Sequence, residues 1–170
     1  VAVTRKEIQL ADIDLSSDHL VIDCTGFKRK IMNLPDNFVK TQGIFNDRAY
    51  VYRHSYTDQQ HQQLAYTRFK ALDHGWIFHI PLRDEIVLGY VHDSKFSDQA
   101  LIDYKQYVDQ YFGINSNIDE YKHVSMITGR NKIHLKDNIA AIGLSSGFIE
   151  PLESTGLYMV ISNLQLLKKY

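Results

Sequence analysis

Two carboxylates in the segment SGFIEPLESTGLYMV, residues 146–160, are the best candidates for chemistry in this chain. Glu150 and Glu153 flank Pro151 and stand just before an apolar stretch that begins after Gly156. A carboxylate at such a position can act as a general base if its pKa and its geometry suit. It can equally complement the positive end of a helix dipole, and an acid before proline is an ordinary turn residue. The spacing alone leaves both interpretations open.

The residues after these glutamates predict a helix. Apolar side chains recur at i, i+3, i+4 and i+7, which is the pattern of an amphipathic helix. They are Leu157, Val160, Ile161, Leu164 and Leu167. The free backbone N–H groups in the first turn of a helix, together with its dipole, attract anions. Thr155 and Gly156 supply such groups, so we expect a small anion or an electron-rich edge of a cofactor to lie at this helix start.

A short buried strand is predicted near the start of the chain. Residues 19–23 form an apolar run that ends in Asp23 and is followed by Gly26. Ligands of α/β proteins bind beyond the carboxyl ends of strands in such a layout. Cys24, at the end of this run, is interpreted as a small buried packing residue rather than a nucleophile.

The middle of the chain predicts an antiparallel sheet. Residues 44–56 are rich in aromatic and β-branched types, and residues 76–92 read as two strands joined by a polar turn at 83–85. Strand alternation places Trp76, Phe78 and Ile80 on one face, where they form an aromatic wall.

A helix and further short strands follow this sheet. Ser97 is a candidate N-cap and Gly113 a candidate C-terminal stop. Residues 121–128 predict a strand, with a turn at 129–131 before another strand at 139–143. The expected fold class is therefore mixed α/β, with a mainly antiparallel sheet and covering helices.

Composition excludes several classes of partner. The 170 residues carry 19 Lys and Arg against 20 Asp and Glu, with no block of like charge that marks a nucleic-acid or anionic-membrane surface. The single cysteine and the lack of a long apolar run favour a cytoplasmic location. His54 and His61 are interpreted as solvated loop histidines, so no metal site is expected.

The two ends of the sequence suggest an internal piece of a longer protein. The chain opens without methionine, and a helical pattern is still running at residues 166–170. No repeat, low-complexity tract or linker indicates a domain boundary within it.

Several motifs resemble the flavin-dependent tryptophan halogenase family. GFIEPLESTG at 147–156 is similar to the family's Gly-Phe-Val/Ile-Glu-Pro-Leu-Glu-Ser/Ala-Thr, and DCTGF at 23–27 is similar to its Asp-Cys-Ser-Gly-Phe. Residues 66–97 resemble its Tyr-Thr, Gly-Trp-x-Trp-x-Ile-Pro-Leu and Gly-Tyr-Val block, and Gly129-Arg130 precedes the last motif in the family's order. The motifs extend over nearly the whole chain.

This resemblance implies part of an FAD-dependent monooxygenase-like fold. Residues 19–27 and 139–170 would contact flavin and halide, and the sheet and helix of 44–128 would face the substrate. The implied cofactors are a halide ion and FAD, and a separate flavin reductase would supply the FAD in its reduced form. The enzyme would use reduced FAD, oxygen and halide to halogenate an aromatic, indole-like substrate.

The resemblance also implies a role for individual residues. Glu153 would be the catalytic glutamate beside the substrate, and the backbone of Thr155 and Gly156 would hold the halide. The flavin-contacting residues would be Gly26, Phe27, Gly143, Gly147 and Ser154. The substrate pocket would include Trp76, Phe78, Ile80 and Pro81.

The sequence departs from the family's pattern at two points. None of its nine glycines forms the Gly-x-Gly of the FAD pyrophosphate loop, and the region of the family's catalytic lysine is missing, so we expect this piece alone to be inactive. Phe78 stands where the family has its second tryptophan. Two other functions therefore stay open, a related flavin monooxygenase and a non-catalytic binding domain.

Overall fold

The computed structural model describes residues 11, 19–32, 34–56, 66–152 and 155–169. These residues pack as two compact units, one within 1–42 and 127–170 and the other within 43–126. Both are mixed in secondary structure, and most strand pairs are antiparallel, as predicted.

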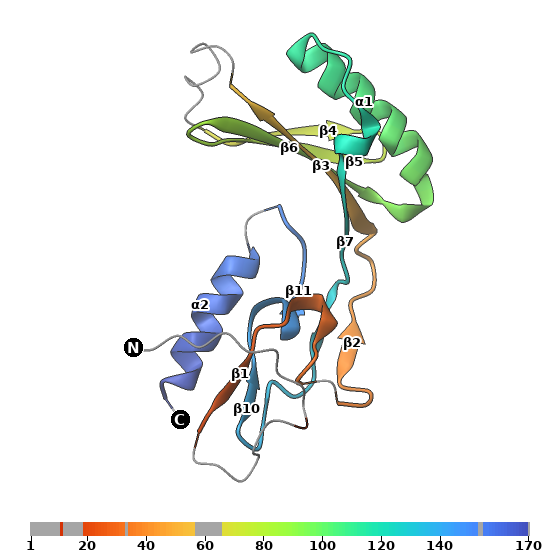
Figure 1. Cartoon of the computed structure of the whole chain (residues 1–170). Coiled ribbons are helices and arrows are strands. Elements are labelled where there is room, and N and C mark those ends of the chain that lie inside the picture. The colour runs from red at the N-terminus through yellow and green to blue at the C-terminus, as the bar shows by residue number, and fades with distance from the viewer. Residues whose placement is uncertain (1–10, 12–18, 33, 57–65, 153–154, 170) are drawn as a thin grey trace. The chain divides into compact units, whose positions relative to one another are not determined.

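The unit of residues 43–126 is an antiparallel sheet with one covering helix (Figure 1). Its strand order is β4-β5-β6-β3-β7, and α1 packs on β6 and β3. The strands are β3 Asn46–Ser55, β4 Arg68–Leu72, β5 Gly75–Pro81, β6 Glu85–Asp93 and β7 Lys122–Ser125, and the helix is α1 Ser97–Phe112.

The hairpin of β5 and β6 confirms the two strands predicted at 76–92. The backbone N–H of Leu82 donates to the carbonyl of Glu85 at 2.8 Å and closes the turn. Ile77 and His79 on β5 are buried toward α1, whereas Trp76 and Phe78 point to the opposite face and are half-buried. The alternation read from the sequence therefore holds along β5.

Helix α1 ends where the sequence predicted and begins differently. Gly113 adopts the left-handed conformation, with φ 67°, which suits glycine at a helix C-terminus. The prediction of Ser97 as N-cap is wrong, because Ser97 is already the first helical residue. Asp93 caps a preceding turn, η4 (Ser94–Phe96), by accepting from the Lys95 N–H.

The core between α1 and the sheet is rich in tyrosine. Tyr104 on α1 is fully buried, and its hydroxyl accepts from the N–H of Tyr52 at 3.1 Å and donates to the carbonyl of Leu88 at 2.7 Å. Tyr52 and Leu88 are cross-strand partners in β3 and β6, so this hydroxyl joins the helix to both strands.

The other unit contains two small sheets and a helix. In one sheet β1 pairs in parallel with β10, which pairs with β9; the other has the order β11-β8-β2. Helix α2 packs against the short turn η6. The strands are β1 Val21–Asp23, β2 Phe38–Lys40, β8 Gly129–Asn131, β9 Leu135–Lys136, β10 Ile139–Ala141 and β11 Gly147–Phe148, and the other elements are η6 Gly143–Ser145 and α2 Thr155–Leu167.

The turn predicted at 129–131 is wrong. These residues form β8, the central strand of a sheet in which Asn131 pairs with Phe38 and Arg130 with Gly147. The strand predicted at 121–128 is correspondingly shorter, since β7 covers only Lys122–Ser125.

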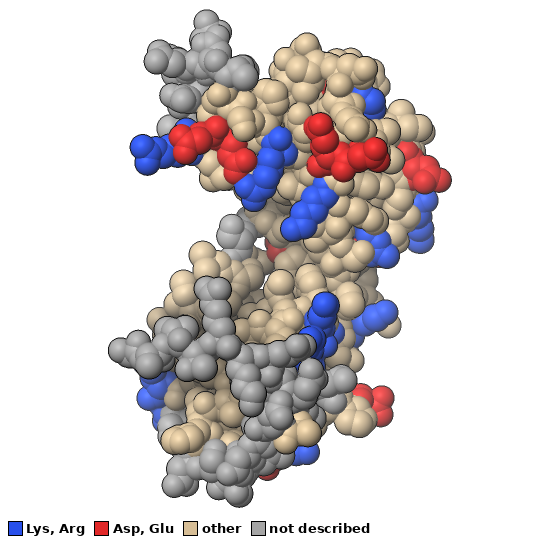
Figure 2. Space-filling model, in the orientation of Figure 1, with Lys and Arg blue, Asp and Glu red and all other residues tan. Residues whose placement is uncertain are grey.

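Surface charge follows the balanced composition. Acidic and basic side chains are interspersed on the face shown in Figure 2. Among the described residues, no helix is long and apolar enough to cross a membrane, and no group of three or more His, Cys, Asp or Glu side chains is arranged to hold a metal ion. A cytoplasmic location stays a prediction.

Candidate functional site

The carboxylate of Asp23 organises the turn that follows β1. Asp23 is 1% exposed. Its Oδ1 accepts from the N–H and the hydroxyl of Thr25 at 2.9 and 2.7 Å, and its Oδ2 accepts from the N–H groups of Ile31 and Met32 at 3.2 and 2.8 Å. Four donors thus fix residues 24–32 against the end of the strand.

The same residue joins this turn to the one after β10. The carbonyl of Asp23 accepts from the N–H of Ile142 at 3.0 Å and from the hydroxyl of Ser145. Gly26 and Gly143 each begin a short turn with positive φ, 72° and 65°, a conformation that favours glycine. The two glycine turns therefore lie at the carboxyl ends of the parallel pair β1 and β10.

Two aromatic rings complete this junction. Phe27 meets Phe148 edge to face, with their ring centroids 5.4 Å apart. A Cβ at Gly147 would lie 2.8 Å from the carbonyl oxygen of Gly129, so β11 can approach β8 this closely only with glycine. The structure thus brings together four residues predicted to contact flavin, namely Gly26, Phe27, Gly143 and Gly147.

The strip before α2 is held by Glu150. Its Oε2 accepts from the N–H of Leu152 at 2.6 Å, and its carbonyl accepts from the hydroxyl of Thr155 at 2.9 Å. Glu150 is therefore a turn residue, which is one of the interpretations that the spacing left open. Glu153 and Ser154 lie outside the described residues.

Helix α2 begins at Thr155, as the predicted anion site requires. A Cβ at Gly156 would meet no atom within 4 Å, so the backbone there is open to approach. The apolar stripe of this helix is largely uncovered within its unit, since Leu157 is 65% and Ile161 48% exposed.

The predicted aromatic wall is present in the other unit. Trp76 meets Phe69 of β4 at a centroid distance of 5.7 Å and Phe78 at 6.0 Å. Ile80 is 37% exposed, and Pro81 ends β5. The result is a partly exposed aromatic surface on the face of the sheet opposite α1.

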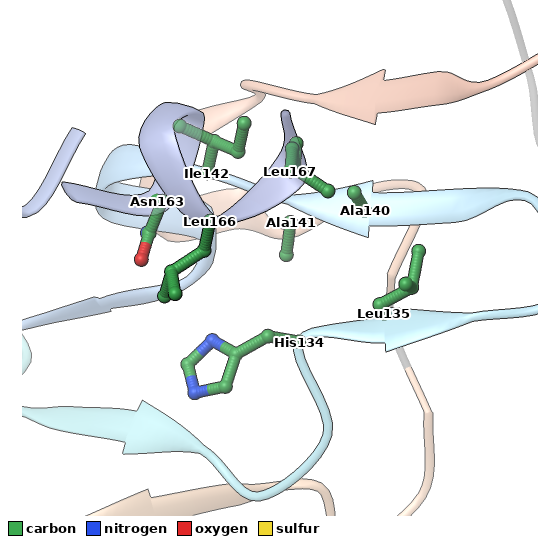
Figure 3. A pocket seen from close by; sticks show the side chains of 8 residues that line it. All are labelled: His134, Leu135, Ala140, Ala141, Ile142, Asn163, Leu166 and Leu167. Carbon is green, nitrogen blue, oxygen red and sulfur yellow. The ribbon is translucent and has the colours of Figure 1, made fainter. Parts of the chain in front are cut away.

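A cavity of about 290 Å³ lies between α2 and the β9-β10 pair (Figure 3). Its walls are mostly aliphatic, with His134 and Asn163 as polar groups. His134 Nδ1 lies 2.8 Å from the hydroxyl of Ser146, which also accepts from Asn163 Nδ2 at 3.2 Å. Burial, and secondarily the charge of Arg130, lower the pKa of His134 below its ordinary value of 6.5. The neutral ring fits this apolar site.

Sequence reasoning missed the polar groups that hold the junction together. Ser145, Ser146 and Asn131 are at most 1% exposed, and Asn131 donates from its side chain to the carbonyl of Ser145 at 2.9 Å. Short polar residues between a strand and a glycine look like an ordinary loop, so the sequence holds no signal for them. The prediction of Cys24 as a buried packing residue is wrong, because Cys24 is exposed. The buried side chain at this strand end is that of Asp23.

Comparisons with known proteins place the whole chain in one family. A family model described as tryptophan halogenase matches residues 5–170. A tryptophan 6-halogenase from Streptomyces toxytricini is 34% identical over 160 residues, which make up 92% of this chain and 30% of that relative. A tryptophan 7-halogenase from Lentzea aerocolonigenes is 29% identical over 156 residues, 89% of this chain and 29% of the relative.

Solved structures give the same result. The Streptomyces toxytricini enzyme superposes with a TM-score of 0.75 at 34% identity, over 89% of this chain and 31% of that chain. A flavin-dependent halogenase from Brevundimonas sp. BAL3 has a TM-score of 0.73 at 31% identity, over 88% and 30%. The chain thus spans about 30% of the length of the curated relative from Streptomyces.

Proposed function

Because the chain belongs to the tryptophan halogenase family, we propose that it forms the part of an FAD-dependent halogenase that contacts flavin, halide and an aromatic, indole-like substrate. This membership confirms the resemblance drawn from the motifs at 23–27, 66–97 and 147–156. The activity belongs to the whole enzyme, of which this chain supplies the described turns and the aromatic sheet.

The observation that carries the proposal is the junction at the carboxyl ends of β1 and β10. Ligands in α/β folds bind at this place, since the strand ends leave a crevice lined by backbone groups. Two glycine turns, joined through the Asp23 carbonyl, meet there within the residues that match the family.

The described residues fit a flavin at this junction. A Cβ at Gly26 would meet no atom within 4 Å, so a flat ring system can approach the backbone of the turn at 26–28. Phe27 follows Gly26 in this turn, and Gly143 and Leu144 are the accessible residues of the second turn. Bound at this junction, reduced FAD together with oxygen would supply the oxidising power that converts halide into an electrophile.

Halide would bind at the start of α2. Thr155 and Gly156 lie in the first helical turn, where N–H groups lack intrahelical acceptors and the dipole favours an anion. Thr155 is fixed there by its hydrogen bond to the Glu150 carbonyl. Glu153, next to this turn in sequence, would take up the proton that the aromatic carbon loses when halogen replaces it.

The aromatic substrate would bind on the wall formed by Trp76 and Phe78, with Ile80 and Pro81 at its end. Ring stacking on such a surface selects planar aromatic molecules. Leu82 to Asp84 then turn the chain back into β6.

The proposal is tested with the full-length enzyme that contains this chain, a flavin reductase with NADH, FAD, oxygen, bromide and an indole substrate. Mass spectrometry of the product should show the paired isotope peaks of bromine. A product that gains only oxygen would favour a flavin monooxygenase instead. No product, together with intact substrate binding, would favour a binding domain and overturn the proposal.

A further inference from the structure

The ring of Phe78 lies over a glycine of the neighbouring strand. Phe78 on β5 and Gly89 on β6 are cross-strand partners. A Cβ added at Gly89 would overlap Cζ and Cε1 of Phe78 and would lie 2.8 Å from its Cε2. The far end of the ring thus occupies the space that any other residue at position 89 would fill.

Backbone conformation does not explain this glycine. Gly75 and Gly129 have φ of 157° and 151°, but Gly89 is outside the range that disfavours other residues. Its lack of a side chain therefore matters for the ring above it.

The residues beside Gly89 show how local this gap is. Val87 and Val91 are two positions away along β6 and thus point to the same face. Both are buried, at 8% and 1% exposure. Only between these two valines does the strand leave room for a ring to lie directly on its backbone.

We propose that Gly89 is a positioning residue for the aromatic wall. It lets the Phe78 ring lie low on the sheet, next to Trp76, and so leaves room above Phe78 for a planar aromatic substrate. An alanine at position 89 would lift or rotate the ring into that space. This inference rests on the proposed function, since it assigns the wall to the substrate.

Binding of 6-fluoroindole, followed by ¹⁹F NMR titration of the protein, tests the inference without flavin, halide or turnover. We expect Gly89→Ala to weaken binding about three- to tenfold, the range expected when one aromatic contact is lost. Phe78→Leu should weaken binding similarly. In the Phe78→Leu background, Gly89→Ala should change affinity less than about twofold, because the ring that it displaces is gone.

Val87→Ala is the matched control, because it alters the same face of the same strand but leaves the space between the Phe78 ring and Gly89 unchanged. It should bind 6-fluoroindole within about twofold of wild type. An equal loss for Gly89→Ala with and without the Phe78 ring would overturn the inference, as would unchanged affinity in Gly89→Ala or no binding by the wild type.

Folding is checked on each variant by urea unfolding. If Gly89→Ala does not fold but Gly89→Ala/Phe78→Leu does, the result would support the inference that the Phe78 ring needs the space over Gly89. If neither variant folds, the inference is overturned. The outcome is separable from that of the proposed function. If the effect of Gly89→Ala on 6-fluoroindole binding depends on the Phe78 ring but no brominated product forms, the role of Gly89 stands and only the halogenase proposal is overturned.

Discussion

Asp23 shows how one side chain fixes the proposed flavin site. Its carboxylate, 1% exposed, accepts four hydrogen bonds from Thr25, Ile31 and Met32. In Asp23→Asn an amide N–H₂ replaces one acceptor and faces backbone donors. We expect the free energy of unfolding to fall by about 2 to 4 kcal/mol, measured by urea denaturation.

Asp36→Asn is the control for this prediction. Asp36 is exposed and has a positive φ of 53°, which asparagine tolerates well. Its stability should stay within about 0.5 kcal/mol of wild type. Equal effects of the two substitutions would contradict the role given to Asp23.

For single residues, the sequence identified where an acid or a cysteine stands but not its burial or its hydrogen-bond partners. The acid at the end of β1 was evident, but its four donors come from a turn whose path no local pattern predicts. Cys24 was expected inside and Asp23 received no structural role, because burial after a strand depends on how the following loop folds back.

At the scale of elements, α1 is held on the sheet by the Tyr104 hydroxyl. Tyr104→Phe keeps the ring but leaves the Tyr52 N–H and the Leu88 carbonyl without this partner in a buried site. We expect a loss of about 2 to 3 kcal/mol in the free energy of unfolding, measured by urea denaturation. Tyr66→Phe, at a site that is 58% exposed, should change the free energy of unfolding little. A similar loss in Tyr66→Phe would argue against a stabilising role of the Tyr104 hydroxyl.

The end of α1 is predicted to respond to acid. Burial raises the pKa of Asp109, but hydrogen bonds from Lys105 and Ser116 outweigh it and lower the pKa below 3.8. A carboxylate with a depressed pKa adds stability that is complete above the unfolded value and is lost as pH falls through the folded value.

Asp109→Asn tests this response. The difference in free energy of unfolding between wild type and Asp109→Asn should be constant above about pH 5 and should shrink at about pH 3. Asp119→Asn, on an exposed residue near the same loop, serves as the control. A difference that does not change with pH would show that the Asp109 carboxylate contributes nothing through its charge.

Elements with a clear period were predictable, and those without one were not. The hairpin of β5 and β6 and the helix α1 carry alternating or helical apolar patterns over many residues. Strand β8 has three residues, and its identity comes from pairing with β2 and β11. Such a strand contains too few residues for a local pattern to distinguish it from a turn.

At the scale of the whole molecule, the chain forms two compact units, and each holds a different part of the proposed binding sites. One holds the junction of Gly26, Phe27, Gly143 and Gly147, and the other holds the aromatic wall. Spacing predicted an anion site and an aromatic face separately. It could not predict that the two glycine turns meet, because this depends on the parallel pairing of β1 with the distant β10.

The comparison of Glu153→Gln with Glu150→Gln tests the central claim most directly, namely that the strip before α2 carries out chemistry. The readout is the rate of brominated product that the full-length enzyme containing this chain forms with reduced FAD, oxygen and bromide. We predict that Glu153→Gln lowers this rate about 100-fold or more, as expected for loss of a general base. Glu150→Gln keeps an acceptor oxygen for the Leu152 N–H and should retain most of the activity. Equal rates in Glu153→Gln and wild type would contradict the account.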